Sequence, residues 1–161
     1  MIRGNRMSIL QVVKGCPLFY ELYDEEILNI VGSCRVLNLS PGDVIFNNGD
    51  IGNELFLILN GSAVVKRGNL ELAHLHKGDL FGEMVLLKDN LRKADTVADD
   101  FCDILVVDYE TIFCHYQNDS KTFALLILNL ARMLATRLHK AGGIIEKLVL
   151  ENAKLKDKKA A

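Results

Sequence analysis

The spacing of apolar residues divides the chain into three stretches. Over residues 16–36 apolar positions recur every three or four residues, as in an amphipathic helix, and Asp24 is placed to cap it. Over residues 36–109 short runs of Val, Ile, Leu and Phe are separated by turn signals roughly every ten residues. After Thr111 the helical spacing returns. The pattern therefore predicts a mainly β domain with helices before and after it.

The turn signals of the middle stretch favour an antiparallel architecture. They are Pro41-Gly42, Asn48-Gly49, Asn60-Gly61, Gly68-Asn69 and Lys77-Gly78. Two of them, Asn60-Gly61 and Gly68-Asn69, are typical of hairpins, so residues 64–67 and 70–76 are predicted to be neighbouring strands. Regular turns of this kind indicate a sandwich or a barrel, and their spacing does not choose between the two.

The C-terminal third predicts one short helix over residues 111–118 and a long one from Ser120 to at least His139. Apolar residues then continue in alternating steps of four and three, which is a heptad seam. Its members are Leu134, Leu138, Ala141, Ile145, Leu148, Asn152 and Leu155. The seam requires a partner helix, with Asn152 as a candidate register-setting polar residue. The alternative is a helix that ends at Gly142-Gly143, because two glycines cost about 2 kcal/mol relative to alanine.

Composition narrows the class of protein. The 161 residues, 50% of them hydrophobic, suffice for one core and are too few for two ordinary domains. A formal charge of −2 argues against a general nucleic-acid surface. No apolar run approaches the roughly 20 residues of a membrane span, and the first ten residues do not resemble a signal peptide, so a cytoplasmic location is expected. The scattered cysteines predict reduced thiols: Cys16, Cys34, Cys102 and Cys114.

A glycine-lined turn, a carboxylate and a guanidinium fall close together in the stretch that begins at Lys77. Gly78 and Gly82 let backbone N–H groups approach an anion, and the apolar run after Glu83 predicts a short helix whose N-terminus favours negative charge. Arg92 supplies a planar fork suited to phosphate oxygens, whereas Glu83 suits a hydroxyl group. The pattern indicates a small phosphorylated ligand, and a sugar phosphate fits both groups.

The segment Phe81-Gly-Glu-Met-Val-Leu-Leu-Lys-Asp-Asn-Leu-Arg-Lys-Ala94, here called the cassette, resembles the phosphate-binding cassette of the cyclic nucleotide-binding domain family. This is the regulatory domain of catabolite activator proteins, cyclic-nucleotide-dependent kinases and cyclic-nucleotide-gated channels. Further motifs follow the family's order and spacing: Leu39-Ser-Pro-Gly-Asp-Val-Ile-Phe46, Gly49-Asp50, Leu55-Phe-Leu-Ile-Leu-Asn-Gly61 and Lys77-Gly-Asp79. The resemblance covers residues 16–138 and implies an antiparallel β-roll or jelly roll (double-stranded β-helix) with an N-terminal helix and a long C-terminal helix.

The resemblance also implies roles for residues of the cassette. Arg92 would pair with the cyclic phosphate, Glu83 would bind the ribose 2′-hydroxyl, and backbone amides around Gly82 would complete the cage. The expected ligand-binding set is Gly82, Glu83, Met84, Val85, Arg92, Lys93 and Ala94. Contacts to the base are expected from the C-terminal helix, with Met133, Thr136 and Arg137 as candidates.

Two positions depart from the family pattern. Val85 is larger than the Ala, Cys or Gly of many members and would crowd the ribose. Lys93 replaces a residue that is often Ser, Thr or Ala, and the absence of a hydroxyl there favours cyclic AMP over cyclic GMP. The expected domains are an N-terminal extension over residues 1–15, the nucleotide-binding domain over 16–138, and a helical extension, a candidate coiled coil, over 139–161.

The expected function is that of a sensor in which ligand binding moves the C-terminal helix and alters a homodimer or a contact with an effector protein. No catalysis, cofactor, metal, nucleic acid or membrane partner is expected. One alternative is a scaffold of the same fold that no longer binds nucleotide, and the departures at Val85 and Lys93 favour it. Another is a metal-dependent cupin-type enzyme that uses His74 and His76, which lie on one face of a predicted strand.

Overall fold

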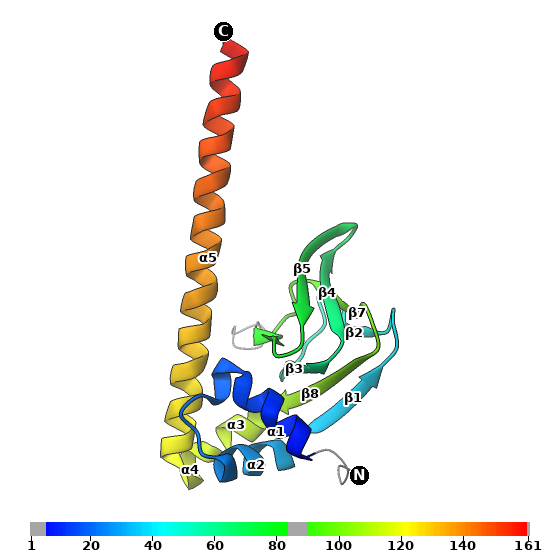
Figure 1. Ribbon diagram of the computed structural model, residues 1–161, viewed down its shortest axis with the longest axis vertical. Helices are drawn as coiled ribbons and strands as arrows, with labels where there is room; N and C mark the ends of the chain where they lie inside the picture. The colour runs from blue at the N-terminus through cyan, green and yellow to red at the C-terminus, as the bar shows by residue number, and fades with distance from the viewer. Residues whose placement is uncertain (1–5, 84–89, 161) are drawn as a thin grey trace.

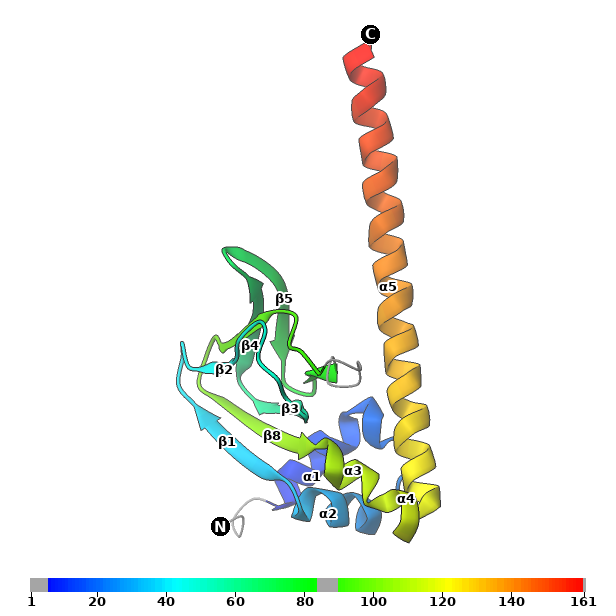
Figure 2. The ribbon, with the colours of Figure 1, turned by 180° about the vertical axis from the view of Figure 1, so that it is seen from behind.

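The structure, a computed structural model, describes residues 6–83 and 90–160 of the chain. Two antiparallel sheets form a β-roll, short helices gather at one end of it, and one long helix rises past it (Figures 1 and 2). The predicted class, mainly β with flanking helices and a long C-terminal helix, is confirmed. In the described part of the chain, none of the helices combines the length and the apolar character that crossing a membrane requires.

The roll consists of two four-stranded sheets with the orders β1-β8-β3-β6 and β2-β7-β4-β5. The strands are β1 (Arg35–Leu39), β2 (Val44–Phe46), β3 (Glu54–Asn60), β4 (Ser62–Arg67), β5 (Leu70–His76), β6 (Leu80–Phe81), β7 (Asp95–Ala98) and β8 (Cys102–Asp108). Of the two turns predicted to form hairpins, Gly68-Asn69 does so: β4 and β5 pair from Ser62 opposite His76 to Arg67 opposite Leu70. The prediction for Asn60-Gly61 is wrong, because the chain there passes from β3 of one sheet to β4 of the other.

Strand β3 separates two apolar cores, because its residues 55–59 are all buried and successive side chains point to opposite faces. Leu55 and Leu57 pack with the helices, whereas Phe56 and Ile58 pack inside the roll. The paired strand β8 alternates in the same way. A strand buried on both faces explains why this stretch reads as an uninterrupted apolar run.

The N-terminal helices belong to the core beneath the roll. They are α1 (Arg6–Gly15), the 3₁₀ helix η1 (Pro17–Phe19) and α2 (Asp24–Gly32). Ile9 and Val13 of α1 are buried there. The predicted cap of α2 is wrong by one residue: Asp24 is its first helical residue, and the backbone N–H of Tyr23 donates to the Glu26 carboxylate at 2.6 Å.

The C-terminal region begins with two short helices, α3 (Tyr109–Phe113) and α4 (His115–Asn118), where the sequence predicts one. Helix α5 (Ser120–Ala160) starts as predicted and runs without interruption through Gly142 and Gly143. The alternative of a helix that ends at these glycines is therefore wrong. Leu126 and Leu130 of α5 are buried in the core, but between Leu138 and Leu155 its apolar side chains are exposed.

Candidate functional site

The backbone of Arg92 is fixed by two hydrogen bonds to the Gly49-Asp50 turn. Its N–H donates to the carbonyl of Asp50 at 2.8 Å, and its own carbonyl accepts from the N–H of Gly49 at 2.9 Å. The side chain that this segment carries is only 3% exposed. The Gly49-Asp50 turn thus fixes the backbone position from which the Arg92 guanidinium extends. Gly49 lies 43 residues before Arg92 in the sequence (92 − 49 = 43).

The Arg92 guanidinium has several partners. Nη1 donates to the carbonyl of Gly82 at 2.9 Å, and Nη2 donates at 3.0 Å both to the carbonyl and to carboxylate oxygen Oε2 of Glu54. The rings of Phe46 and Phe56 lie 4.5 and 5.2 Å from its Cζ atom, within the range of cation–π attraction. Burial lowers the pKa of Arg92 and the charge of Glu54 opposes that shift, so the group stays cationic.

Two glycines are required by this close packing. Gly82 has a φ of +85°, and a Cβ there would lie 3.0 Å from Nη1 of Arg92 and 2.9 Å from Phe56. A Cβ on Gly52 would lie 2.5 Å from Nη2 of Arg92. Any side chain at either position would therefore push the guanidinium out of its place.

Glu83 connects the cassette to the long helix. Its Oε1 atom lies 2.5 Å from Nη1 of Arg137, and Nη2 of Arg137 donates to the carbonyl of Leu80 in β6. The Glu83 side chain is mostly buried, whereas that of Arg137 is partly exposed. The carboxylate predicted for ribose binding is thus paired, in this structure, with one of the residues predicted for base contact.

Of the other predicted cassette residues, Lys93 and Ala94 belong to the described part of the chain. The carbonyl of Lys93 accepts a hydrogen bond from Nη2 of Arg67 at 2.8 Å, and Ala94 directly precedes β7. Met84 and Val85 lie outside the described residues. The effect of the larger Val85 side chain on a ligand stays a prediction.

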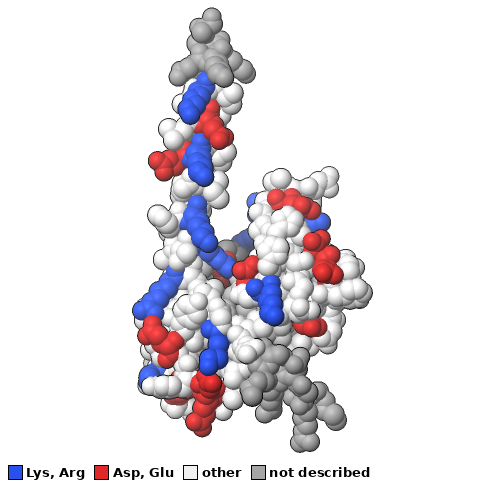
Figure 3. Space-filling view, in the orientation of Figure 1, with Lys and Arg blue, Asp and Glu red and all other residues white. Residues whose placement is uncertain are grey.

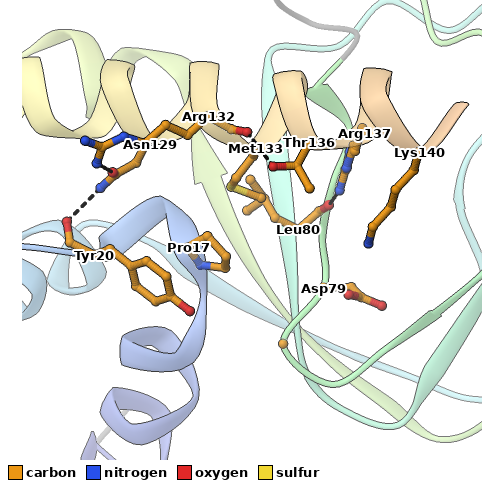
Figure 4. Close-up of a pocket in the computed structure, with 11 residues that line it drawn as sticks. Pro17, Tyr20, Asp79, Leu80, Asn129, Arg132, Met133, Thr136, Arg137 and Lys140 are labelled. Carbon is orange, nitrogen blue, oxygen red and sulfur yellow. Dashed lines mark hydrogen bonds between the residues drawn. The ribbon is translucent and has the colours of Figure 1, made fainter. Parts of the chain in front are cut away.

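The three candidates for base contact lie on one side of α5 and line a cavity of 430 Å³ (Figure 4). The opposite walls come from η1, with Pro17 and the following Tyr20, and from Asp79 in the turn before β6 and Leu80 at its start. Lys and Arg side chains follow the described part of α5, with Glu side chains among them (Figure 3). The candidates Met133, Thr136 and Arg137 therefore face a hollow with a basic rim.

Sequence reasoning missed the groups that hold Arg92 from beyond the cassette. They are Phe46, Gly52, Glu54 and Phe56. One signal was available: Glu54 is a single carboxylate directly before the apolar run of β3. Its pairing with a residue 38 positions later (92 − 54 = 38) becomes visible only in three dimensions.

Residues considered for other chemistry are not arranged for it. His74 and His76 are both exposed on β5, and Nε2 of His74 lies 3.6 Å from Glu71. Over residues 6–83 and 90–160, no three His, Cys, Asp or Glu side chains gather as a metal site would require. Burial raises the pKa of Cys16 to about 11 and that of Cys34 to about 12, so neither thiol is a ready nucleophile at neutral pH.

Residues 36–118 match the sequence model of a family described as the cyclic nucleotide-binding domain. The cyclic AMP receptor protein of Thermus thermophilus is 35% identical over 148 residues, which cover 88% of this chain and 66% of that protein. The cAMP-dependent protein kinase regulatory subunit of Hypocrea atroviridis is 34% identical over 82 residues, 51% of this chain and 18% of the relative. The chain thus spans less than two thirds of the length of these relatives.

Solved structures show the same architecture. The catabolite activator protein of Thermus thermophilus superposes with a TM-score of 0.71 at 31% identity, over 82% of this chain and 62% of that one. A cyclic nucleotide-binding domain from Methylobacillus flagellatus superposes with a TM-score of 0.72 at 24% identity, over 83% and 78% of the two chains. At that lower identity the likeness concerns the fold alone.

Proposed function

Because this chain belongs to the cyclic nucleotide-binding domain family, we propose that it binds cyclic AMP, in preference to cyclic GMP, and performs no chemistry on it. The observation that carries the proposal is the position of Arg92, a buried guanidinium bonded to the carbonyl of Gly82 directly before Glu83. A cation and a carboxylate at the two ends of the cassette match a ligand with one phosphate and a free hydroxyl.

In the proposed complex, the cyclic phosphate takes a place beside Arg92 that the Glu54 carboxylate holds in the free protein. Glu83 accepts a hydrogen bond from the ribose 2′-hydroxyl, and the remaining contacts come from Gly82, Met84, Val85, Lys93 and Ala94. The exchange of one anion for another keeps the buried charge of Arg92 compensated throughout. Lys93 lacks the hydroxyl that would favour guanine, which supports cyclic AMP.

The coupling to α5 passes through Arg137 in this proposal. Since Glu83 is already paired with Arg137 at 2.5 Å, a ribose hydroxyl must share or displace that guanidinium. Either outcome alters the force with which α5 is held against β6, where Arg137 also bonds to the carbonyl of Leu80. The ligand thereby shifts the helix between positions, and Met133, Thr136 or Arg137 can then meet the base.

We further infer that α5 joins two copies of the chain. Its exposed apolar side chains follow the predicted seam, with Leu138, Ile145, Leu148 and Leu155 all open to solvent in one copy. Burying such a stripe against its counterpart is the ordinary reason for a heptad repeat. A change in α5 on ligand binding would then be passed to the dimer or to an effector protein.

Isothermal titration calorimetry with cyclic AMP and cyclic GMP tests the proposal. Wild-type protein should bind cyclic AMP more tightly, and Arg92→Ala should weaken that binding by about 2–5 kcal/mol because the phosphate loses its counter-charge. Lys66→Ala serves as the control, since it removes a surface cation whose ion pair is with Glu71. No heat and no thermal shift with either nucleotide, for a wild-type protein that is folded by circular dichroism, would refute the proposal and leave the scaffold alternative.

A further inference from the structure

The cavity beside α5 is separate from the phosphate cage of Arg92, because its walls come from η1, the turn before β6 and α5. We propose that this cavity is a second ligand site, which takes a small amphipathic carboxylate with an aromatic or short acyl body. Its volume of 430 Å³ falls within the range of small-molecule sites in proteins.

The interior of the cavity is apolar where a ligand body would lie. Pro17 of η1 and Leu80 of β6 provide two walls, and Met133 of α5 provides a third between them (Figure 4). Leu80 is almost completely buried and Met133 packs on the helical core, so both surfaces are fixed. Methionine is flexible and polarisable, which suits contact with aromatic groups of varied shape.

The rim of the cavity carries an excess of positive charge. It presents Arg132, Arg137 and Lys140 against the single carboxylate of Asp79, a formal balance of three minus one. Arg132 is held at 2.8 Å by Glu21 and Arg137 at 2.5 Å by Glu83. Lys140 makes no hydrogen bond or ion pair with any residue that the structure describes, and its side chain extends from α5 toward the Asp79 side (Figure 4). Its ammonium is therefore the cation available to an incoming carboxylate.

Hydrogen bonds within the protein hold the walls of the cavity in place. Asn129 of α5 is 2% exposed and donates to the carbonyls of Leu18 at 3.2 Å and Tyr20 at 2.7 Å. Its Oδ1 atom accepts from Nη1 of Arg132 at 3.1 Å. These contacts fix η1 against α5 on the far side of the cavity. Because such a site is preformed, little binding free energy is lost to the ordering of its side chains.

Arg137 belongs to both sites, since it lines the cavity and pairs with Glu83 of the cassette. Met133, Thr136 and Arg137 of the cavity wall are also the proposed contacts of the base, so a ligand in the cavity and the base would compete for these side chains. In this respect the inference rests on the proposed function. The two ligands should then weaken each other, and linkage requires the same factor in both directions.

The test uses 4-phenylbutyrate and the neutral 4-phenylbutan-1-ol as matched probes, each titrated into the full chain by calorimetry. The carboxylate should bind more tightly than the alcohol. Lys140→Gln should weaken the carboxylate about three- to tenfold and leave the alcohol unchanged, whereas Asp79→Asn should strengthen the carboxylate. Lys147→Gln is the control, because Lys147 is an exposed lysine of α5 that does not line the cavity.

Two further variants separate this site from the cassette. Met133→Trp should abolish binding of both probes by filling the cavity, and Arg92→Ala should leave 4-phenylbutyrate binding unchanged. Equal affinity for the two probes, no effect of Lys140→Gln, or no binding heat at all would overturn the proposal. If 4-phenylbutyrate binds as expected but cyclic AMP does not, the second site stands and only the proposed function fails.

Discussion

At the scale of single residues, the burial of Arg92 is the feature that most constrains the site. A guanidinium that is 3% exposed requires compensation from the protein, and Glu54 supplies it with both a carboxylate and a carbonyl oxygen. The Glu54 carboxylate accepts a hydrogen bond from Nη2 of Arg92, and in the proposed complex a phosphate would use the same donor. Under the proposed function, Glu54 is thus both the group that compensates the charge of Arg92 and a competitor of the phosphate.

Replacing Glu54 by glutamine should therefore tighten the binding of cyclic AMP, by about 1 kcal/mol once screening at this partly exposed side chain is allowed for. The amide keeps the size and can still accept a hydrogen bond from Arg92, but it removes the competing charge. Calorimetry of Glu54→Gln beside Glu71→Gln, a surface carboxylate change on β5, would measure this. Weaker binding in Glu54→Gln would instead mean that Glu54 chiefly orients Arg92.

The contrast between Glu83 and Glu54 shows what the sequence reveals about single residues. Glu83 and Arg92 lie nine positions apart in one recognisable motif, so their proximity follows from local chain geometry. Glu54 and Gly52 meet Arg92 only because Gly49-Asp50 bonds to its backbone. A contact created by folding over about forty residues leaves no local pattern to find.

At the scale of elements, the start of α5 depends on a cap by Asp119, the residue directly before the helix. The carboxylate of Asp119 accepts from the backbone N–H of Thr122 at 3.1 Å and from its hydroxyl at 2.6 Å. Thr122 itself is fully buried, so the cap anchors the helix to the core. These hydrogen bonds from Thr122 lower the pKa of Asp119.

A lowered pKa in the folded state means that the cap stabilises the protein only when Asp119 is ionised. Its contribution should be complete above the ordinary pKa of an aspartate, about 4, and should fade as the pH falls through the lower folded value. Thermal melts of wild type and Asp119→Ala should differ by a few degrees at pH 7 and converge in acid. Asp119→Asn keeps an acceptor that does not titrate, so a gap between Asn and Ala variants that also vanished in acid would contradict this account.

The elements themselves were predictable to different degrees. The β4–β5 hairpin followed from Gly68-Asn69, because few residues tolerate that turn. The two-residue strand β6 is too short to show a period. Gly142 and Gly143 suggested a break, yet α5 continues through them, so a cost of about 1 kcal/mol for each glycine does not end the helix.

At the scale of the whole molecule, a compact roll carries a helix whose outer half has no counterpart in one copy (Figure 1). A second copy would cover the seam of α5. Leu148→Glu should therefore convert a dimer into a monomer, as measured by light scattering coupled to size-exclusion chromatography. Leu150→Glu is a matched control, because Leu150 is about as exposed, at 55% against 52%, but lies off the seam. A protein that is monomeric at every concentration would contradict the dimer, and so would equal effects of the two changes.

The uninterrupted length of α5 also makes it a lever with its pivot at the roll. From Arg137 to Ala160 the helix rises roughly 35 Å at 1.5 Å per residue. A tilt of about 10° at Arg137 would swing the tip sideways by roughly 6 Å, more than a full helical turn of rise. The rearrangement of a single ion pair at the base would thus be magnified at the far end by geometry alone.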